Sequence, residues 1–192
     1  MASSIEIVSN ALILIGDNPI SSFTEPGAGA TAAANLYSDT YKQLLSEHPW
    51  SFALKEQKLN RLSQAPDALT NWKYAYQNPT DLIRYWAVMP HSDYAIVGSY
   101  VYSNQTELLA RYVFAVAESQ LPPHFQKALE YKLAADFALL VTEDQNKSQV
   151  FEQKYRMAIG QARSIDSQSH PQQAIIDQPF TDVRNNGTAT YF

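Results

Sequence analysis

Apolar side chains recur every three or four residues in four stretches of the chain, a spacing that predicts amphipathic helices. The stretches are residues 5–16, 31–47, 123–142 and 147–164. Ser3 and Glu6 have the spacing of a capping box before the first helix, and Gly16 suits the left-handed residue that ends it. A short polar link at Glu143 and Asp144 separates the last two helices, so we expect them to form an antiparallel hairpin.

Between residues 50 and 117 the pattern changes to runs of aromatic and β-branched residues separated by turn formers. Such runs predict four or five antiparallel strands. They read WKYAY, DLIRYWAVM, YAIVGSYVY and LLARYVFAV. For part of residues 81–89 a helix stays open as an alternative, because periodicity alone does not settle a short apolar run. Together these elements predict an α+β fold in which an antiparallel helical bundle carries an inserted antiparallel β domain.

The boundary between the two patterns lies in the stretch LLSEHPWSFALKE. Pro49 pushes His48 out of the helical conformation, so the second helix must end there. Trp50 and Phe52 follow at once. We interpret Pro49, Trp50 and Phe52 as the anchor of a domain junction, in which the aromatic rings pack the helix end against the sheet. Direct contact with a partner protein is the alternative.

These changes of pattern divide the chain into three parts. Residues 1–49 and 118–164 form the helical bundle, residues 50–117 the inserted β domain, and residues 165–192 an extended C-terminal arm. The arm is rich in Gln, is interrupted by two prolines and cannot build a core of its own. Extended, it would span roughly 90 Å.

Isolated apolar and aromatic residues of the arm could anchor it on a partner, and such a spacing suits strand addition to a sheet edge. The candidate docking residues are Ile175, Ile176, Phe180, Val183, Arg184, Tyr191 and Phe192. A tail without a docking role, or one folded back on its own subunit, is the alternative.

Composition narrows the function classes. With 192 residues, 45% of them hydrophobic, the chain can bury a sizeable core. The absence of cysteine excludes disulfides, thiolate metal sites and a cysteine nucleophile. The formal charge is −5 and the basic residues are dispersed, which argues against wrapping nucleic acid. Neither a long apolar run nor a signal-peptide pattern occurs, so we expect a soluble, cytosolic protein without membrane contact.

Residues with catalytic potential form no recognisable constellation. Ser, His and Asp occur without a Gly-x-Ser-x-Gly elbow. The GAGA stretch at residues 27–30 lacks the Lys of a phosphate loop and is interpreted as a flexible connection. Histidines without helical metal-ligand spacing are His48, His91, His124 and His170. Carboxylates that qualify for glycoside hydrolysis by residue type alone are Glu47, Glu56, Glu130 and Asp136. We therefore predict no catalytic, cofactor-binding or metal-binding residue.

Five segments, in their order along the chain, resemble the head-to-tail adaptor family of tailed bacteriophages, called tail tubular protein A in short-tailed phages. They are NALILIGDNPISSF, YKQLLSEHPWSFAL, NPTDLIRYWAV, GSYVYSNQTELLARYV and PPHFQKALEYKLAADFALLVTEDQNKSQVFEQKYRMAIGQAR. They cover most of residues 5–164, and the ordered set is more specific than any one segment. The terminal QPFTDVR lies where the family often has an aromatic residue followed by a basic one, although Phe180 replaces the expected tryptophan.

The resemblance implies a structural virion protein and not an enzyme. Family members form a dodecameric ring under the portal of the capsid, extend the DNA channel and present a surface to the tail nozzle. The implied partners are therefore the portal protein, the nozzle protein and further copies of the chain. Duplex DNA passes through without tight binding. The implied location is the tail connector of the virion, with the host cytoplasm during assembly, where a monomer is compatible with the family.

Two other functions stay open from the sequence. A peptidoglycan hydrolase carried in the tail would need a cleft with two carboxylates about 5 to 9.5 Å apart. A small binding module unrelated to virions would need no portal partner.

Overall fold

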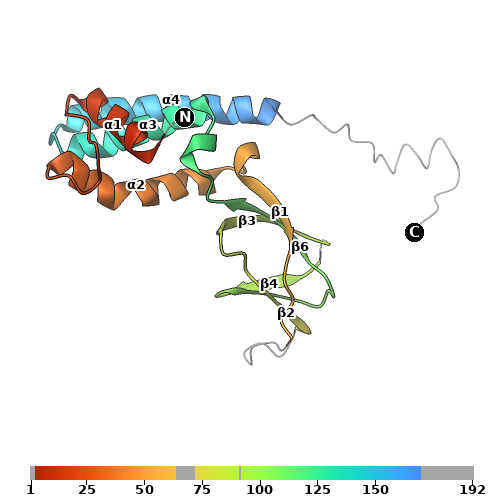
Figure 1. Cartoon of the computed structure of the whole chain (residues 1–192). Helices are drawn as coiled ribbons and strands as arrows, with labels where there is room; N and C mark the ends of the chain where they lie inside the picture. The colour runs from red at the N-terminus through yellow and green to blue at the C-terminus, as the bar shows by residue number, and fades with distance from the viewer. Residues whose placement is uncertain (1–2, 64–71, 91, 170–192) are drawn as a thin grey trace, which may run out of the picture.

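Within the residues that the structure describes, the protein forms four helices and two small antiparallel sheets, which confirms the predicted α+β class. The structure is a computed structural model that describes residues 3–63, 72–90 and 92–169. The helices pack together along one another, and the strands form a region that projects from one end of the bundle (Figure 1). The helices are α1 (Ser4–Ile15), α2 (Ala28–Glu47), α3 (Pro123–Leu140) and α4 (Gln145–Gln168).

Helix α1 begins and ends at the predicted signals. The Glu6 amide donates to the Ser3 hydroxyl at 3.2 Å, which caps the first turn. Gly16 has a φ of 91° and its amide donates to the Ile13 carbonyl, so a residue without a side chain ends the helix in the left-handed conformation. Local sequence signals therefore determine both ends of α1.

The GAGA stretch at residues 27–30 was interpreted as a flexible connection, but in the structure it begins a helix. Gly27 lies before α2, and residues 28–30 form the first turn of that helix. A β-carbon at Gly29 would lie 2.9 Å from an Asp17 carboxylate oxygen and 3.0 Å from a Leu12 methyl group. Gly29 is thus the residue that allows α2 to approach α1 closely.

In the described part of the chain, six strands form two three-stranded antiparallel sheets, ordered β1-β6-β3 and β2-β5-β4. Residues 82–89 are a strand, so the helical alternative for this run is wrong. Strand β1 lies in LKEQK, which the strand patterns of the sequence missed because its side chains are mostly polar and its partner lies far along the chain. The strands are β1 (Leu54–Lys58), β2 (Tyr74–Gln77), β3 (Leu82–Met89), β4 (Tyr94–Val97), β5 (Tyr100–Ser103) and β6 (Leu109–Phe114).

The apolar core has two parts, one in the helical bundle and one between the sheets. The larger part combines all four helices with Trp50, with Val113 of β6 and with Val116 just after that strand. The smaller part lies around Tyr76 and Tyr112. Helices α3 and α4 form the predicted hairpin, with the rings of Tyr131 and Phe151 6.4 Å apart. Side chains of β6 thus contribute to both parts of the core.

Helix α4 is longer than predicted at its C-terminal end. It continues to Gln168, four residues beyond the predicted end of the bundle, so the first part of the predicted arm is helical. The reason is Asp166, a buried carboxylate that bonds to the start of the β region. The sequence signal was misleading because residues 164–169 are mostly polar.

The core assignment of α3 can be tested at Leu133, which is fully buried, against Leu139, which is 54% exposed in the same helix. Leu133→Asp places an unpaired charge in the bundle and should lower the free energy of unfolding by about 3 kcal/mol or more. Leu139→Asp should change it by less than about 0.5 kcal/mol. Chemical denaturation measures both, and equal midpoints for the two variants would contradict this core.

Candidate functional site at the domain junction

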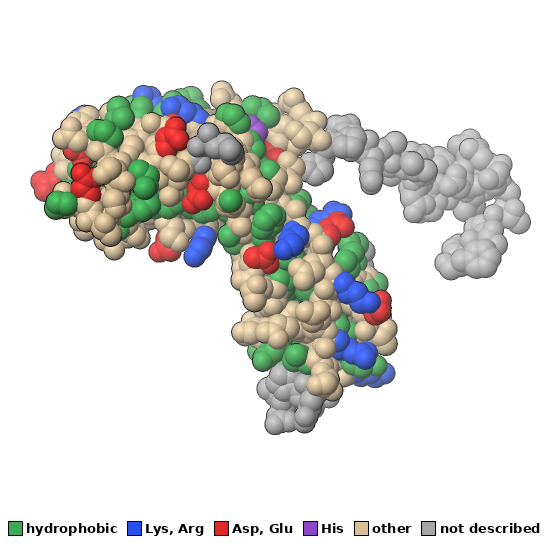
Figure 2. Space-filling view, viewed as in Figure 1, with side chains coloured by type: hydrophobic (Ala, Val, Ile, Leu, Met, Phe, Trp, Pro, Cys, Tyr) green, Lys and Arg blue, Asp and Glu red, His purple; other side chains and the backbone are tan. Residues whose placement is uncertain are grey.

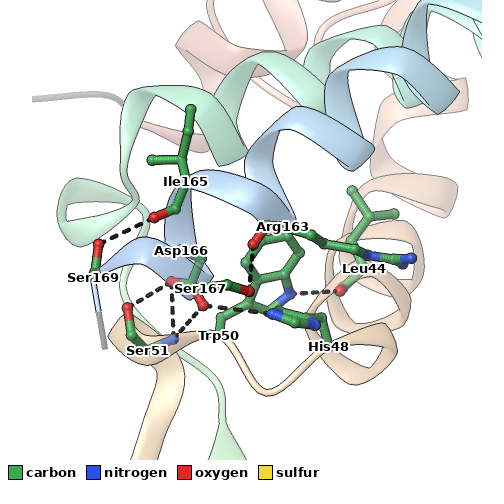
Figure 3. Close-up of polar contacts among 9 residues, drawn as sticks. All are labelled: Leu44, His48, Trp50, Ser51, Arg163, Ile165, Asp166, Ser167 and Ser169. Carbon is green, nitrogen blue, oxygen red and sulfur yellow. Dashed lines mark hydrogen bonds and ion pairs between the residues drawn. The ribbon is translucent and has the colours of Figure 1, made fainter. Parts of the chain in front are cut away.

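Trp50 occupies the centre of the junction between the helical bundle and the β region. Its side chain is fully buried, and its indole N–H donates to the Leu44 carbonyl at 3.0 Å (Figure 3). The ring meets Phe125 of α3 edge-on, with centroids 5.1 Å apart. Leu44 lies in the last turn of α2, so the indole N–H gives a carbonyl near the helix end a side-chain donor.

The two other predicted anchor residues lie around Trp50. Phe52 is partly buried and packs against Phe125 at 5.2 Å between ring centroids. Pro49 ends α2 and is half-buried at the surface beside α4. The three residues hold different positions: Trp50 and Phe52 fill the bundle core, and Pro49 lies at its edge.

Asp166 of α4 is the junction residue that the sequence analysis missed. Its carboxylate accepts the Ser51 amide at 3.1 Å and the Ser51 hydroxyl at 2.6 Å, and it is 3% exposed (Figure 3). The His48 Nε2 atom lies 3.6 Å from the same carboxylate. A buried carboxylate needs such donors to offset its lost hydration. No local signal marks Asp166, because Ser51 lies more than a hundred residues earlier.

Ser51, His48 and Asp166 are the residue types of a hydrolytic triad, but their geometry differs from one. In a triad the histidine lies between the serine and the aspartate and takes the serine proton. Here the Ser51 hydroxyl donates directly to Asp166, and His48 approaches the same carboxylate. The arrangement holds the chain in place and does not activate the serine.

A second polar contact joins α2 to α4 close to the junction. Glu47, the last residue of α2, accepts the Arg163 guanidinium at 2.8 Å and the Tyr155 hydroxyl at 3.2 Å. Burial, followed by the negative charge of Glu47, raises the pKa of Tyr155 above its usual range. The Tyr155 hydroxyl is therefore a permanent donor at physiological pH.

The β region is tied to the bundle from the other side as well. The Tyr41 hydroxyl donates to the Val116 carbonyl just after β6. Arg84 of β3 donates to the Ser46 carbonyl of α2 at 2.8 Å. Burial, and then the nearby Glu118 carboxylate, raises the pKa of Tyr41, so this hydroxyl also keeps its proton. Contacts on both sides of Trp50 thus fix the β region to α2.

An ion pair joins β1 to the residue that precedes β3. Lys55 and Asp81 pair at 2.8 Å, and the Tyr112 hydroxyl donates to Asp81 at 2.9 Å. Burial alone would raise the pKa of Asp81, but the hydrogen bonds from Lys55 and Tyr112 outweigh it and hold that pKa below its usual value. Asp81 is therefore an ionised acceptor and a poor candidate for a general acid.

The four carboxylates considered for glycoside hydrolysis lie at four separate places, each with a cationic partner. Besides Glu47, Glu56 pairs with Arg111 across β1 and β6. Glu130 accepts from Lys127 and from Asn10, both at 2.9 Å. Asp136 pairs with Lys132 at 3.1 Å. Burial raises the pKa of Asp136, although Lys132 opposes the shift. Each of the four carboxylates thus belongs to an ion pair of its own, and they do not form the facing pair of carboxylates that glycoside hydrolysis needs.

The remaining candidates are metal ligands, the other histidines and the predicted docking residues of the arm. Within residues 3–63, 72–90 and 92–169, no group of three His, Asp or Glu side chains could hold a metal ion. His124, at the start of α3, has a buried Nε2 atom without a hydrogen-bond partner. His91, His170 and the whole set of predicted docking residues of the arm lie outside the described residues; that set is Ile175, Ile176, Phe180, Val183, Arg184, Tyr191 and Phe192.

Comparison with known proteins adds no family assignment. No protein-family model and no curated protein sequence matches the chain. In the part of the chain that the structure describes, no helix combines the length and the apolar character needed to cross a membrane.

Replacing Asp166 tests the junction. Asp166→Ala leaves the Ser51 amide without its buried acceptor and should lower the free energy of unfolding by about 1 to 3 kcal/mol. Asp39→Ala, at an exposed position of α2, is the matched control and should have little effect. Denaturant titration compares the two, and an Asp166→Ala variant as stable as the control would show that the bonds to Ser51 contribute nothing.

Proposed function

We propose that the protein is a structural subunit of a bacteriophage virion, a head-to-tail adaptor that connects the portal to the tail nozzle. The observation that carries the proposal is the ordered set of five segments that resemble the adaptor family. The proposal rests on this resemblance and on properties of the surface that are compatible with it.

The described elements give each of these segments a structural role. The first covers the second half of α1 and its Gly16 end, the second ends α2 and carries the junction around Trp50, and the third contains all of β3 except its last residue. The fourth spans β5 and most of β6, and the fifth forms the α3–α4 hairpin. The resemblance thus concerns residues that build the fold and its junction, which supports a shared architecture.

Exposed apolar side chains on both parts of the molecule support a role in assembly. A ring subunit must contact its two neighbours through two different surfaces, because head-to-tail contacts are heterologous. On the bundle Met157 is 63% exposed and Leu140 is 56% exposed. On the β region Val97 is 47% exposed and Ile96 is 46% exposed. These side chains are available for contacts between copies of the chain or with the nozzle protein.

The charge distribution supports passage of DNA without tight binding. Between residues 3 and 49 the charged side chains are Glu6, Asp17, Glu25, Asp39, Lys42 and Glu47. In the view of Figure 2, several acidic side chains lie on the bundle towards its free end, a few Lys and Arg side chains also lie on the bundle, and Lys and Arg side chains of the β region have acidic side chains beside them. Acidic surfaces repel the phosphate backbone and keep tight binding from developing.

Removal of the arm tests the proposed docking to the portal. A chain without residues 170–192 keeps α4 and the Asp166 contacts, so it should still fold and unfold in one cooperative transition. It should fail to attach to portal-bearing capsids, because the apolar docking residues are gone. Replacing Asn185 and Asn186 by Ser in the full chain is the control and should leave attachment intact. Sedimentation of capsids with labelled protein measures binding.

The result that would contradict the docking prediction is saturation of capsids by the truncated chain with the affinity of the full chain. If neither the full chain nor the control variant binds portal-bearing capsids or purified portal, the adaptor function itself is wrong. A non-viral binding module would then be the better hypothesis.

Interaction with DNA gives a separate test. The assembled ring should bind duplex DNA weakly at physiological salt, since its net charge is negative and its basic residues are dispersed. Fluorescence anisotropy with a labelled duplex measures this. Tight binding at moderate salt, lost steeply as salt increases, would contradict a channel through which DNA slides.

A further inference from the structure

A groove lies where the end of α4 meets the first sheet. Pro49, Leu54 of β1, Trp86 of β3 and Arg111 of β6 line it, and Asp166 and Ser167 of α4 close it from the side of the bundle. Trp86 is 49% exposed. A large aromatic ring left half in water beside a proline and a leucine is a favourable site for another apolar group.

Strand register explains how these side chains come together. Glu56 of β1 and Ala87 of β3 are both opposite Arg111 of β6. The pairing of β3 with β6 shifts between Tyr85 and Ala87, so Trp86 is an extra residue in that strand. Such a bulge re-aims the side chain that it carries. The bulge thus lies at Trp86, whose exposed ring lines the same groove as Leu54 and Arg111.

The course of the chain brings a candidate occupant to this groove. Ser167 lines the groove, and α4 ends at Gln168. Pro171 follows, and the next large apolar residues are Ile175 and Ile176. From Ser169 to Ile175 the chain can span up to about 20 Å, which is ample for a site that the end of α4 itself borders.

We propose that residues 170–177 of the same chain fold back into this groove and that Ile175 and Ile176 cover Trp86. Asp177 follows the two isoleucines and can approach Arg111, whose side chain pairs with Glu56 at the groove and is 43% exposed. An apolar pair followed by an acid matches a groove with an aromatic ring and a guanidinium.

This contact holds whether or not the chain is an adaptor, because it needs only the chain's own residues. If the arm also docks on a partner, the two contacts compete for Ile175 and Ile176. The free subunit then keeps these side chains covered until the partner displaces them from Trp86.

Fluorescence quenching by acrylamide tests the proposal in the full chain. In a Trp72→Phe background the remaining tryptophans are Trp50, which is fully buried, and Trp86. Quenching therefore reports mainly on Trp86. Deleting residues 170–192 should raise the Stern–Volmer constant by about twofold or more, because the apolar cover of the ring is removed.

Two full-length variants keep the test independent of the truncation. Ile175→Ser combined with Ile176→Ser should raise quenching as the deletion does, whereas Val183→Ser, a comparable change further along the arm, should leave it unchanged. Equal quenching in the full chain, the deletion and the double variant would overturn the proposal. Protection that disappears on dilution would show that a second copy supplies the segment, which also overturns contact within one chain.

Discussion

The burial of Trp50 is the constraint on which the rest of the structure depends. The ring can enter the bundle core only if α2 ends at His48, and the indole N–H then bonds to a carbonyl of that helix end. The next residue, Ser51, is held by Asp166 near the end of α4. One short segment therefore fixes where α2 stops, where the β region starts and how far α4 continues.

Further contacts join the helical bundle and the β region to each other. Side chains of β6 reach the core of the bundle as well as the core between the sheets. Hydrogen bonds from Tyr41 and Arg84 also join α2 to the β region. A subunit that must transmit contacts between partners at its two ends needs such a stiff connection, which agrees with the proposed adaptor role.

Sequence patterns predicted the elements with local signals and missed those that depend on distant partners. Helix α1 has its cap and its glycine end within the same stretch, and Pro49 marks the end of α2. Strand β1 was missed because its polar residues become a strand only by pairing with β6. Asp166 was missed because its donor, Ser51, is remote in sequence. Trp50 could be found as an anchor since a large aromatic residue directly after a helix-ending proline is unusual, but the groove beside Trp86 depends on strand register.

Hydrogen exchange at the junction tests the central claim most directly, by following the Trp50 indole N–H and the Ser51 amide in the native protein. If the junction opens only when the bundle unfolds, both protons exchange as slowly as the core amides of α3. If both exchange as fast as exposed loop amides while the α3 core stays protected, the two regions are hinged at this point. The account of Trp50 and Asp166 as a rigid connection would then be wrong.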